Sequence, residues 1–315
     1  MDLSSTHLHL LLNHFPTVGF IIAFGLLIFG VIVKSDHLKV ASLVTMVGIA
    51  LLTIPVYATG SAAELRICGD LAARGPCDDE AVSRRLIEMH EGAAFVSLYA
   101  MELAGGLAWL GLWQYRRRRQ IPTWNIVLVL LASVLTLATV TRAATLGGEI
   151  RHPEIRVTVE SPEEPIGRVL GTFIATTPWT WASAEAIHMV GLTLVIGIVL
   201  LVDLKMLGFL PAIPYRTVDR LLPWAILGFA TNVMTGMLFF VATPYQYVGN
   251  PAFDRKLVFL LAAGLNMLLF TFDGAWTREG QPAPVYSKAL AVTALALWVG
   301  VMFWGTMLPY IGQAF

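Results

Sequence analysis

Three of the seven histidines lie where long apolar segments of the chain begin, at His14, His90 and His188. A histidine at the edge of a bilayer is costly to keep there, so it usually has a partner such as a cofactor, a metal or a proton. Two histidines on facing helices of a bundle are the usual way to hold a b-type haem. On the topology argued below, six of the seven histidines fall at one membrane surface, which makes them the first candidates for chemistry.

His14 and His90 form the first candidate pair. The two helices that carry them both begin on the outer side, so the imidazoles lie at similar depth and are expected to be the axial ligands of one haem b. Haem propionates need cations, and Arg84, Arg85 and Arg142 lie at that level. The alternative is that these are interfacial histidines, hydrogen-bonded to neighbouring helices.

A second site is expected between His188 and His9. His9 and His14 are separated by five residues, about 140° around a helix, so one can face the first bundle while the other faces away. A second haem between His9 and His188 is one interpretation. A haem with a single histidine ligand, a methionine ligand such as Met189, or no metal at all are the alternatives.

A copper or zinc site is the competing metal hypothesis. His7 and His9, together with His152, can form a surface site. The histidines and cysteines do not follow a zinc-binding spacing. His37 is expected to be a solvated loop residue.

The elements that must position these histidines are membrane helices. The chain has 315 residues, of which 57% are hydrophobic and only 13% charged, against about 25% charged in a soluble domain. Long apolar runs are typical of transmembrane helices. They predict an all-α polytopic membrane protein with eight spans, at roughly 10–33, 40–58, 89–114, 123–146, 183–206, 219–243, 256–274 and 286–308.

The charges near the span ends predict the orientation. Four consecutive arginines at 116–119 place the loop between the third and fourth spans in the cytoplasm. Alternation then places both termini in the periplasm, in the inner membrane of a bacterium. The first residues lack the positive region of a cleavable signal peptide, so none is predicted.

Cys68 and Cys77 lie in the long loop between the second and third spans, which this topology places outside. Disulfides persist in such a compartment, so the two cysteines are expected to form one. Two free thiols, or a metal site completed by other ligands, are the alternatives.

A proline-rich segment divides the chain into two halves. Residues 1–146 are expected to form a four-helix bundle with the haem-type histidine pair, and residues 183–315 a second four-helix bundle. Residues 147–182 are expected to form a periplasmic connection. The halves resemble a faint repeat, opened by NHFPTVG in the first and AIHMVG in the second.

Two family resemblances agree with this division. The N-terminal half, with HLHLLLNHFP and later MHEGA, resembles an uncharacterised bacterial family of four-helix membrane proteins marked by a His-Phe-Pro motif on the first helix. The C-terminal half, with IHMVGL, LLVDLKMLG, TGMLFFVATP and LAAGLN, resembles a second uncharacterised bacterial membrane family. Together they cover most of the chain and imply its fold, but no settled activity. Likeness to four-helix cytochrome b proteins is an analogy of fold.

Other polar residues fall inside the predicted spans. Glu102 is expected near mid-membrane, where a carboxyl group is protonated or paired: a bond to Asn232 or Asn266 is one interpretation, and a role in relaying protons is the alternative. Asp203 and Lys205 are expected to form a pair at the end of a helix.

These features predict a haem b-binding electron-transfer subunit of a larger membrane complex. It would exchange electrons with quinol, with a periplasmic partner such as a cytochrome c or an iron–sulfur protein, or with both. Because the histidine candidates lie at one depth, one chain alone is not expected to carry electrons across the bilayer. A non-redox structural or assembly subunit, and a metal-handling or transport protein, are the alternatives.

The sequence also argues against several other classes. A net charge of +0 without a basic stripe gives no sign of nucleic-acid binding. Phosphate-binding, dinucleotide-binding, esterase and HExxH motifs do not occur. The chain is therefore expected to be a redox subunit rather than a stand-alone enzyme.

Overall fold

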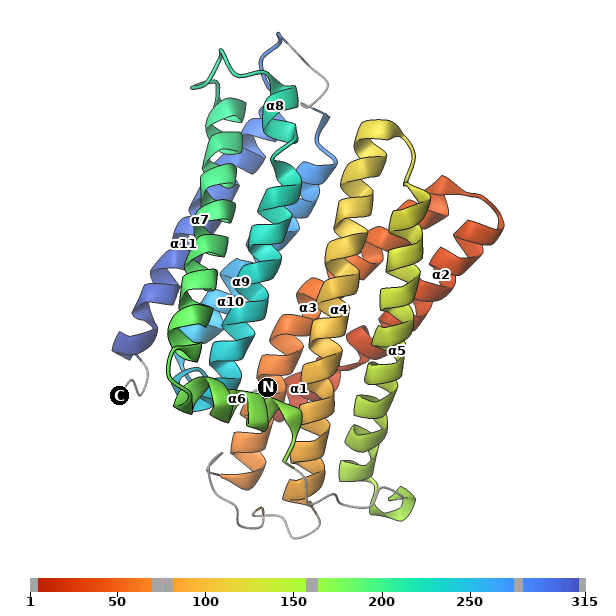
Figure 1. Cartoon of the computed structure of the whole chain (residues 1–315), viewed down its shortest axis with the longest axis vertical. Helices are drawn as coiled ribbons and strands as arrows, with labels where there is room; N and C mark the ends of the chain where they lie inside the picture. Colours follow the sequence, from red (N-terminus) through yellow and green to blue (C-terminus); the bar gives the residue numbers. More distant parts are fainter. Residues whose placement is uncertain (1–4, 70–76, 78–81, 157–163, 275–279, 312–315) are drawn as a thin grey trace.

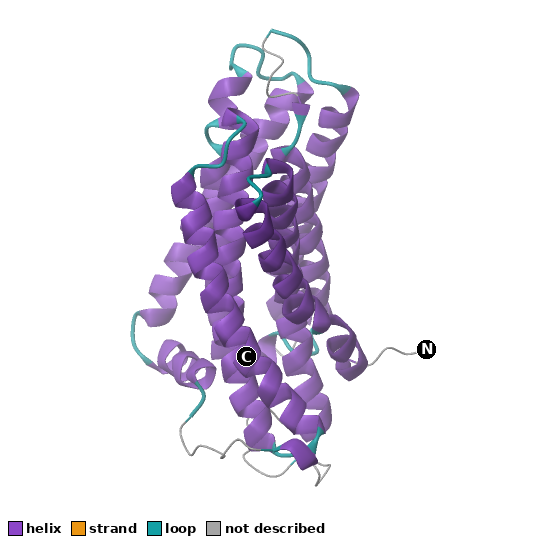
Figure 2. Cartoon of the chain, turned by 90° about the vertical axis from the view of Figure 1, so that its right-hand side faces the viewer, coloured by secondary structure: helices purple, strands orange, loops and turns teal. Residues whose placement is uncertain are grey.

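The computed structural model describes residues 5–69, 77, 82–156, 164–274 and 280–311. Within these ranges the secondary structure is helical and contains no strand (Figure 2). The predicted all-α class is therefore confirmed for the part of the chain that the structure describes.

The first half consists of long helices packed side by side (Figure 1). Its N-terminal span is built from α1, a π-helical segment called η1, and α2. The helices of this half are α1 (Ser5–Leu12), η1 (Phe15–Gly19), α2 (Phe20–Ile32), α3 (Asp36–Cys68), α4 (Arg84–Arg118) and α5 (Thr123–Arg151).

The second half has the same plan, with α7, α9, α10 and α11 as its long helices. Short elements join them. The remaining helices are η2 (Pro153–Ile155), α6 (Ile166–Thr176), α7 (Thr180–Leu207), α8 (Tyr215–Asp219), α9 (Leu222–Ala242), η3 (Pro244–Gln246), α10 (Pro251–Thr271) and α11 (Val285–Ile311).

Seven helical segments among the described residues are long and apolar enough to cross a membrane, counting Ser5–Ile32 as one. By length and composition the chain is therefore a multi-pass membrane protein. The remaining predicted span, the seventh at 256–274, corresponds to α10, which has 21 residues and carries Asp254, Arg255 and Lys256 near its start. That α10 also crosses the membrane, and that both termini are periplasmic, stay predictions.

The helices α3 and α4 are longer than the predicted spans. With 33 and 35 residues, each is about 50 Å long at 1.5 Å per residue, against about 30 Å of hydrocarbon. Helix α3 ends at Cys68, and a disulfide joins Cys68 to Cys77 in the following connection, which confirms the predicted pairing. The buried Arg84 donates a hydrogen bond to the Cys68 carbonyl, so the start of α4 is tied to the end of α3.

Helix α6 lies across the ends of α7 and α9 and beside α4, and belongs to the predicted connecting segment (Figure 1). Gly171 lets α6 approach the backbone of α9 at Val241 more closely than any side chain would allow. Arg168 forms an ion pair with Glu88 of α4 at 2.9 Å. Helix α6 therefore contacts both halves of the molecule.

The two halves share one hydrophobic core among the described residues. Direct hydrogen bonds also join them: the Tyr99 hydroxyl donates to the Met234 carbonyl at 2.8 Å, and the Trp109 indole donates to the Thr271 hydroxyl at 2.9 Å. The predicted division into two bundles describes the chain order, but the halves are packed against each other.

Candidate functional site

The main candidate site is a cavity of about 470 Å³ in the first half, lined by residues of α1, η1, α3, α4 and α5. This volume lies within the roughly 300–1,000 Å³ typical of sites for small molecules and cofactors. Its lining is mostly apolar. The titratable side chains that line it are His9, His14, Tyr57, Glu64, His90, Glu91 and His152.

Two of these histidines are held in the same way by the backbone of neighbouring helices. The Nδ1 atom of His9 lies 3.0 Å from the Val56 carbonyl oxygen on α3. The Nδ1 atom of His90 lies 2.8 Å from the Ala143 carbonyl oxygen on α5. A carbonyl oxygen only accepts, so each Nδ1 must donate its proton, and each neutral ring presents Nε2 as a free electron-pair donor. Metal-binding histidines are commonly oriented by this type of hydrogen bond.

The His9 and His90 rings lie opposite one another. Their centroids are 6.5 Å apart and their planes make an angle of 78°. Metal–imidazole bonds are about 2 Å long. Two such bonds in line, together with the distance from each bonded nitrogen to its ring centroid, separate the two ring centroids by about 6 Å. The separation of the two ring centroids is therefore close to the separation of two imidazoles bound to one metal atom.

Glycines on the neighbouring helices allow both rings to approach the backbone. A Cβ atom at Gly60 on α3 would lie 3.0 Å from Cε1 of His9, and one at Gly147 on α5 would lie 3.1 Å from Cε1 of His90. Both distances are tighter than ordinary van der Waals contact. Each imidazole therefore occupies a space that only glycine leaves open.

His14, the predicted partner of His90, lines the same cavity but is not the residue opposite it. Its side chain is exposed, and Nδ1 lies 3.1 Å from the carbonyl oxygen of Leu10, one turn earlier in its own segment. The structure brings the His9 ring, rather than that of His14, against the His90 ring, while the pairing of His14 with His90 as haem ligands stays a prediction. The regular helix assumed between the two histidines is interrupted there, because α1 ends at Leu12 and Asn13 lies in a turn.

His188 lies in the second half and does not line this cavity. Its Nδ1 atom lies 2.7 Å from the Thr235 hydroxyl, and its ring packs edge-on against Phe239 at 5.6 Å. The predicted pairing of His188 with His9 is therefore not formed, because His9 lies against α3 and faces His90. Met189, the other ligand considered for this site, is 49% exposed.

The three arginines considered for haem propionates lie outside the cavity lining. Arg84 binds the Cys68 carbonyl, Arg85 forms an ion pair with Glu88 at 2.9 Å, and Arg142 is exposed. Their contact with propionates stays a prediction.

The alternative copper or zinc site is not formed by the described residues. They contain no group of three or more histidine, cysteine, aspartate or glutamate side chains arranged to hold a metal ion. His7 is exposed, and His152 lies 3.0 Å from Glu154 through Nδ1.

Acidic and phenolic groups also line the cavity, and of these Glu64 and Tyr57 were not predicted from the sequence. Glu64 is 4% exposed, the Glu91 carboxylate accepts a hydrogen bond from the Ser61 hydroxyl at 2.9 Å, and Tyr57 is 6% exposed. The predicted span ended at residue 58 and therefore assigned Ser61 and Glu64 to a loop. The small residues around Gly60 are the signal that could have extended this helix.

No family model matches the chain. No curated protein and no solved structure matches it either. The resemblances stated from the sequence therefore stay expectations. Fold and cavity together define the class: a helical multi-pass membrane protein with a histidine-lined cavity between its helices.

Proposed function

We propose that this protein is a haem b-binding electron-transfer subunit of a membrane complex, with His9 and His90 as the axial ligands. The observation that carries the proposal is the pair of imidazoles 6.5 Å apart across a cavity, each with Nδ1 bound to a backbone carbonyl. Such a pair meets the ligand requirement of a low-spin b-type haem. When bound, the haem supplies one-electron transfer.

The chain's own residues account for binding and orientation. Val56 and Ala143 hold the two rings through their carbonyl groups, and Gly60 and Gly147 leave room for them. The mostly apolar lining of the cavity lowers the local dielectric, which is one of the main controls on the redox potential of a metal site.

The site belongs to the periplasmic side in this proposal. His90 lies near the start of α4, and the arginines at 116–118 end the same helix. The 26 residues from His90 to Arg116 correspond to about 39 Å, more than the thickness of the hydrocarbon core. Because arginine-rich ends favour the cytoplasm, the histidine cavity faces the periplasm of a bacterial inner membrane crossed by eight helices.

We place the electron partners on the same side. A quinol in the bilayer and a periplasmic cytochrome c or iron–sulfur protein can both approach a haem at this depth. The second haem predicted at His188 loses its proposed partner, since His9 is committed to His90. A single haem per chain is therefore the simplest form of the proposal.

Absorption spectra of the purified protein and of histidine variants test this function. The wild-type protein should show sharp, reducible b-type bands with one haem per chain. His9→Ala and His90→Ala should each lose the six-coordinate spectrum and most of the haem. A colourless wild-type protein from haem-sufficient cells would contradict the proposal and favour a structural, assembly or transport role.

His14→Ala and His188→Ala are the matched controls. His14 lines the same cavity but bonds to its own helix, and His188 lies elsewhere. Both variants should retain the haem and its spectrum. If His14→Ala loses the haem while His9→Ala keeps it, the pairing first expected from the sequence is the correct one.

A further inference from the structure

A buried carboxyl group in the second half has no partner in the described part of the chain. Asp203 lies on α7, one turn before the helix ends at Leu207, and is 1% exposed. Neither of its carboxyl oxygens has a hydrogen-bond partner there. The predicted pairing with Lys205 is not formed, because Lys205 donates to the carbonyls of Leu210 and Pro211.

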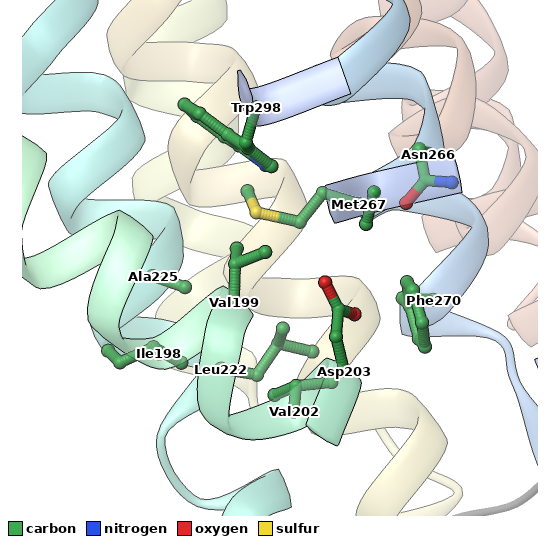
Figure 3. A pocket seen from close by; sticks show the side chains of 11 residues that line it. Ile198, Val199, Val202, Asp203, Leu222, Ala225, Asn266, Met267, Phe270 and Trp298 are labelled. Carbon is green, nitrogen blue, oxygen red and sulfur yellow. The ribbon is translucent and has the colours of Figure 1, made fainter. Parts of the chain in front are cut away.

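Asp203 lines a small cavity between α7, α9, α10 and α11 (Figure 3). It is the only titratable side chain among the described residues of the lining. Apart from Asn266 and the indole of Trp298, the surrounding side chains are apolar, with Met267 and Phe270 close to the carboxyl group in Figure 3. An ionised carboxylate in such surroundings is strongly unfavourable unless a cation or several donors face it.

The cavity has room for one water molecule. Its volume is about 20 Å³, against roughly 10–15 Å³ needed for a single water on the same measure. Asn266 donates through Nδ2 to the Leu290 carbonyl at 3.2 Å, and in Figure 3 its amide oxygen points toward the cavity. A water in this space therefore finds the Asp203 carboxyl group on one side and the Asn266 oxygen on the other.

We propose that Asp203 is a buried proton-binding site of the second half, in which the carboxyl group holds a proton and one water joins it to Asn266. The site lies toward the end of the molecule where α7 leads to α8, and the histidine cavity lies toward the other end (Figure 1). It is independent of the haem proposal, since no residue lines both cavities.

Infrared difference spectroscopy of the purified protein tests the proton. At neutral pH the wild type should show the carbonyl band of a protonated carboxylic acid, shifted downward in heavy water. Asp203→Asn should lose one such band and keep another, because Glu102, also buried with an unpartnered Oε1 atom, is unchanged. If Asp203→Asn loses no such band, Asp203 is ionised and the proposal is wrong.

Asp219→Asn is the matched control. Asp219 is also a buried aspartate, but it forms ion pairs with Arg116 and Arg117. This variant should lose no band of a protonated acid and should unfold at a lower temperature, because it leaves two arginines without their anion. Asp203→Asn should unfold at the wild-type temperature or above it.

Two further measurements keep the proposal testable if Asp203→Asn does not fold. In wild-type protein grown with carboxyl-labelled [13C]aspartate, a protonated-acid band should shift to lower frequency. The absence of any shifted band would contradict a protonated Asp203. In Asn266→Leu the same band should move to higher frequency as the water loses its partner, and an unmoved band would rule out the bridging water.

Discussion

At the scale of single residues, the site depends on where the backbone holds two imidazoles. The carbonyls of Val56 and Ala143 fix His9 and His90 with Nε2 free. The cost of burying a histidine among apolar helices is offset by these hydrogen bonds and, in the proposed complex, by the bond to the haem iron. A site prepared in this way is sensitive to small displacements of either ring.

The glycines beside the two rings offer the sharpest test at this scale. In Gly60→Ala and Gly147→Ala, the added Cβ would lie 3.0 and 3.1 Å from the His9 and His90 rings and should push each ring out of line. Haem affinity should fall on the order of tenfold, about 1.4 kcal/mol. Haem titration of apoprotein, followed by absorbance, measures this loss.

Gly48→Ala is the matched control, because it lies on the same helix as Gly60 and a Cβ there would meet nothing within 4 Å. It should leave haem affinity unchanged and favour the helix by up to about 1 kcal/mol. Equal haem affinity in Gly48→Ala and Gly60→Ala would show that the ring position does not depend on Gly60.

The sequence predicted His14 as the partner of His90, and the structure instead packs the His9 ring against the His90 ring. His90 was predicted from its place at the start of an apolar helix, and the structure keeps it at the site. His9 was assigned to His188 because a regular helix places it about 140° from His14. The relative orientation of two histidines separated by five residues depends on local helix geometry, and residue spacing alone does not report that α1 ends at Leu12, between them.

At the scale of helices, most of the fold could be predicted, because apolar runs long enough for a membrane are a strong signal. Each predicted span overlaps a long helix of the structure. The extent of α3 was missed, since Ser61 and Glu64 interrupt the apolar pattern after residue 58. Helix α6 was missed because it is short and lies across the ends of the other helices.

The disulfide fixes the end of α3 beside the start of α4, the helix that carries His90. The two cysteines are separated by nine positions, and closing a loop of this size contributes about 2–3 kcal/mol. The double variant that combines Cys68→Ala and Cys77→Ala should have a free energy of unfolding lower by this amount. Denaturant unfolding in detergent, with and without reductant, measures it.

The double variant also serves as the control for the reductant. Reductant should destabilise the wild type and leave the variant unchanged. If oxidised wild type and the double variant unfold at the same denaturant concentration, the disulfide does not stabilise the helix ends.

At the scale of the whole molecule, the halves form one packed unit with two cavities toward opposite ends (Figure 1). The histidine cavity and the Asp203 cavity therefore face different membrane surfaces if the predicted orientation is correct. In the proposed function, the haem therefore exchanges electrons at one membrane surface. The second cavity contains no histidine among its described lining residues, so it does not offer a second haem site for electron transfer across the bilayer.

The orientation can be measured with single cysteines, because neither native cysteine is free. His37→Cys, in the exposed first turn of α3, should be protected from a membrane-impermeant maleimide in intact spheroplasts. Glu154→Cys, whose side chain is 68% exposed in the wild type, should be labelled. The reverse pattern would place the histidine cavity in the cytoplasmic half.

The central claim is that His9 and His90 bind one haem iron from opposite sides. Electron paramagnetic resonance of the oxidised, purified protein tests it most directly. Two imidazoles whose planes lie near the observed 78° should give a low-spin ferric signal of strong anisotropy, lost in His9→Ala and retained in His14→Ala. A high-spin signal in the wild type, or a low-spin signal that survives in His9→Ala, would contradict the account.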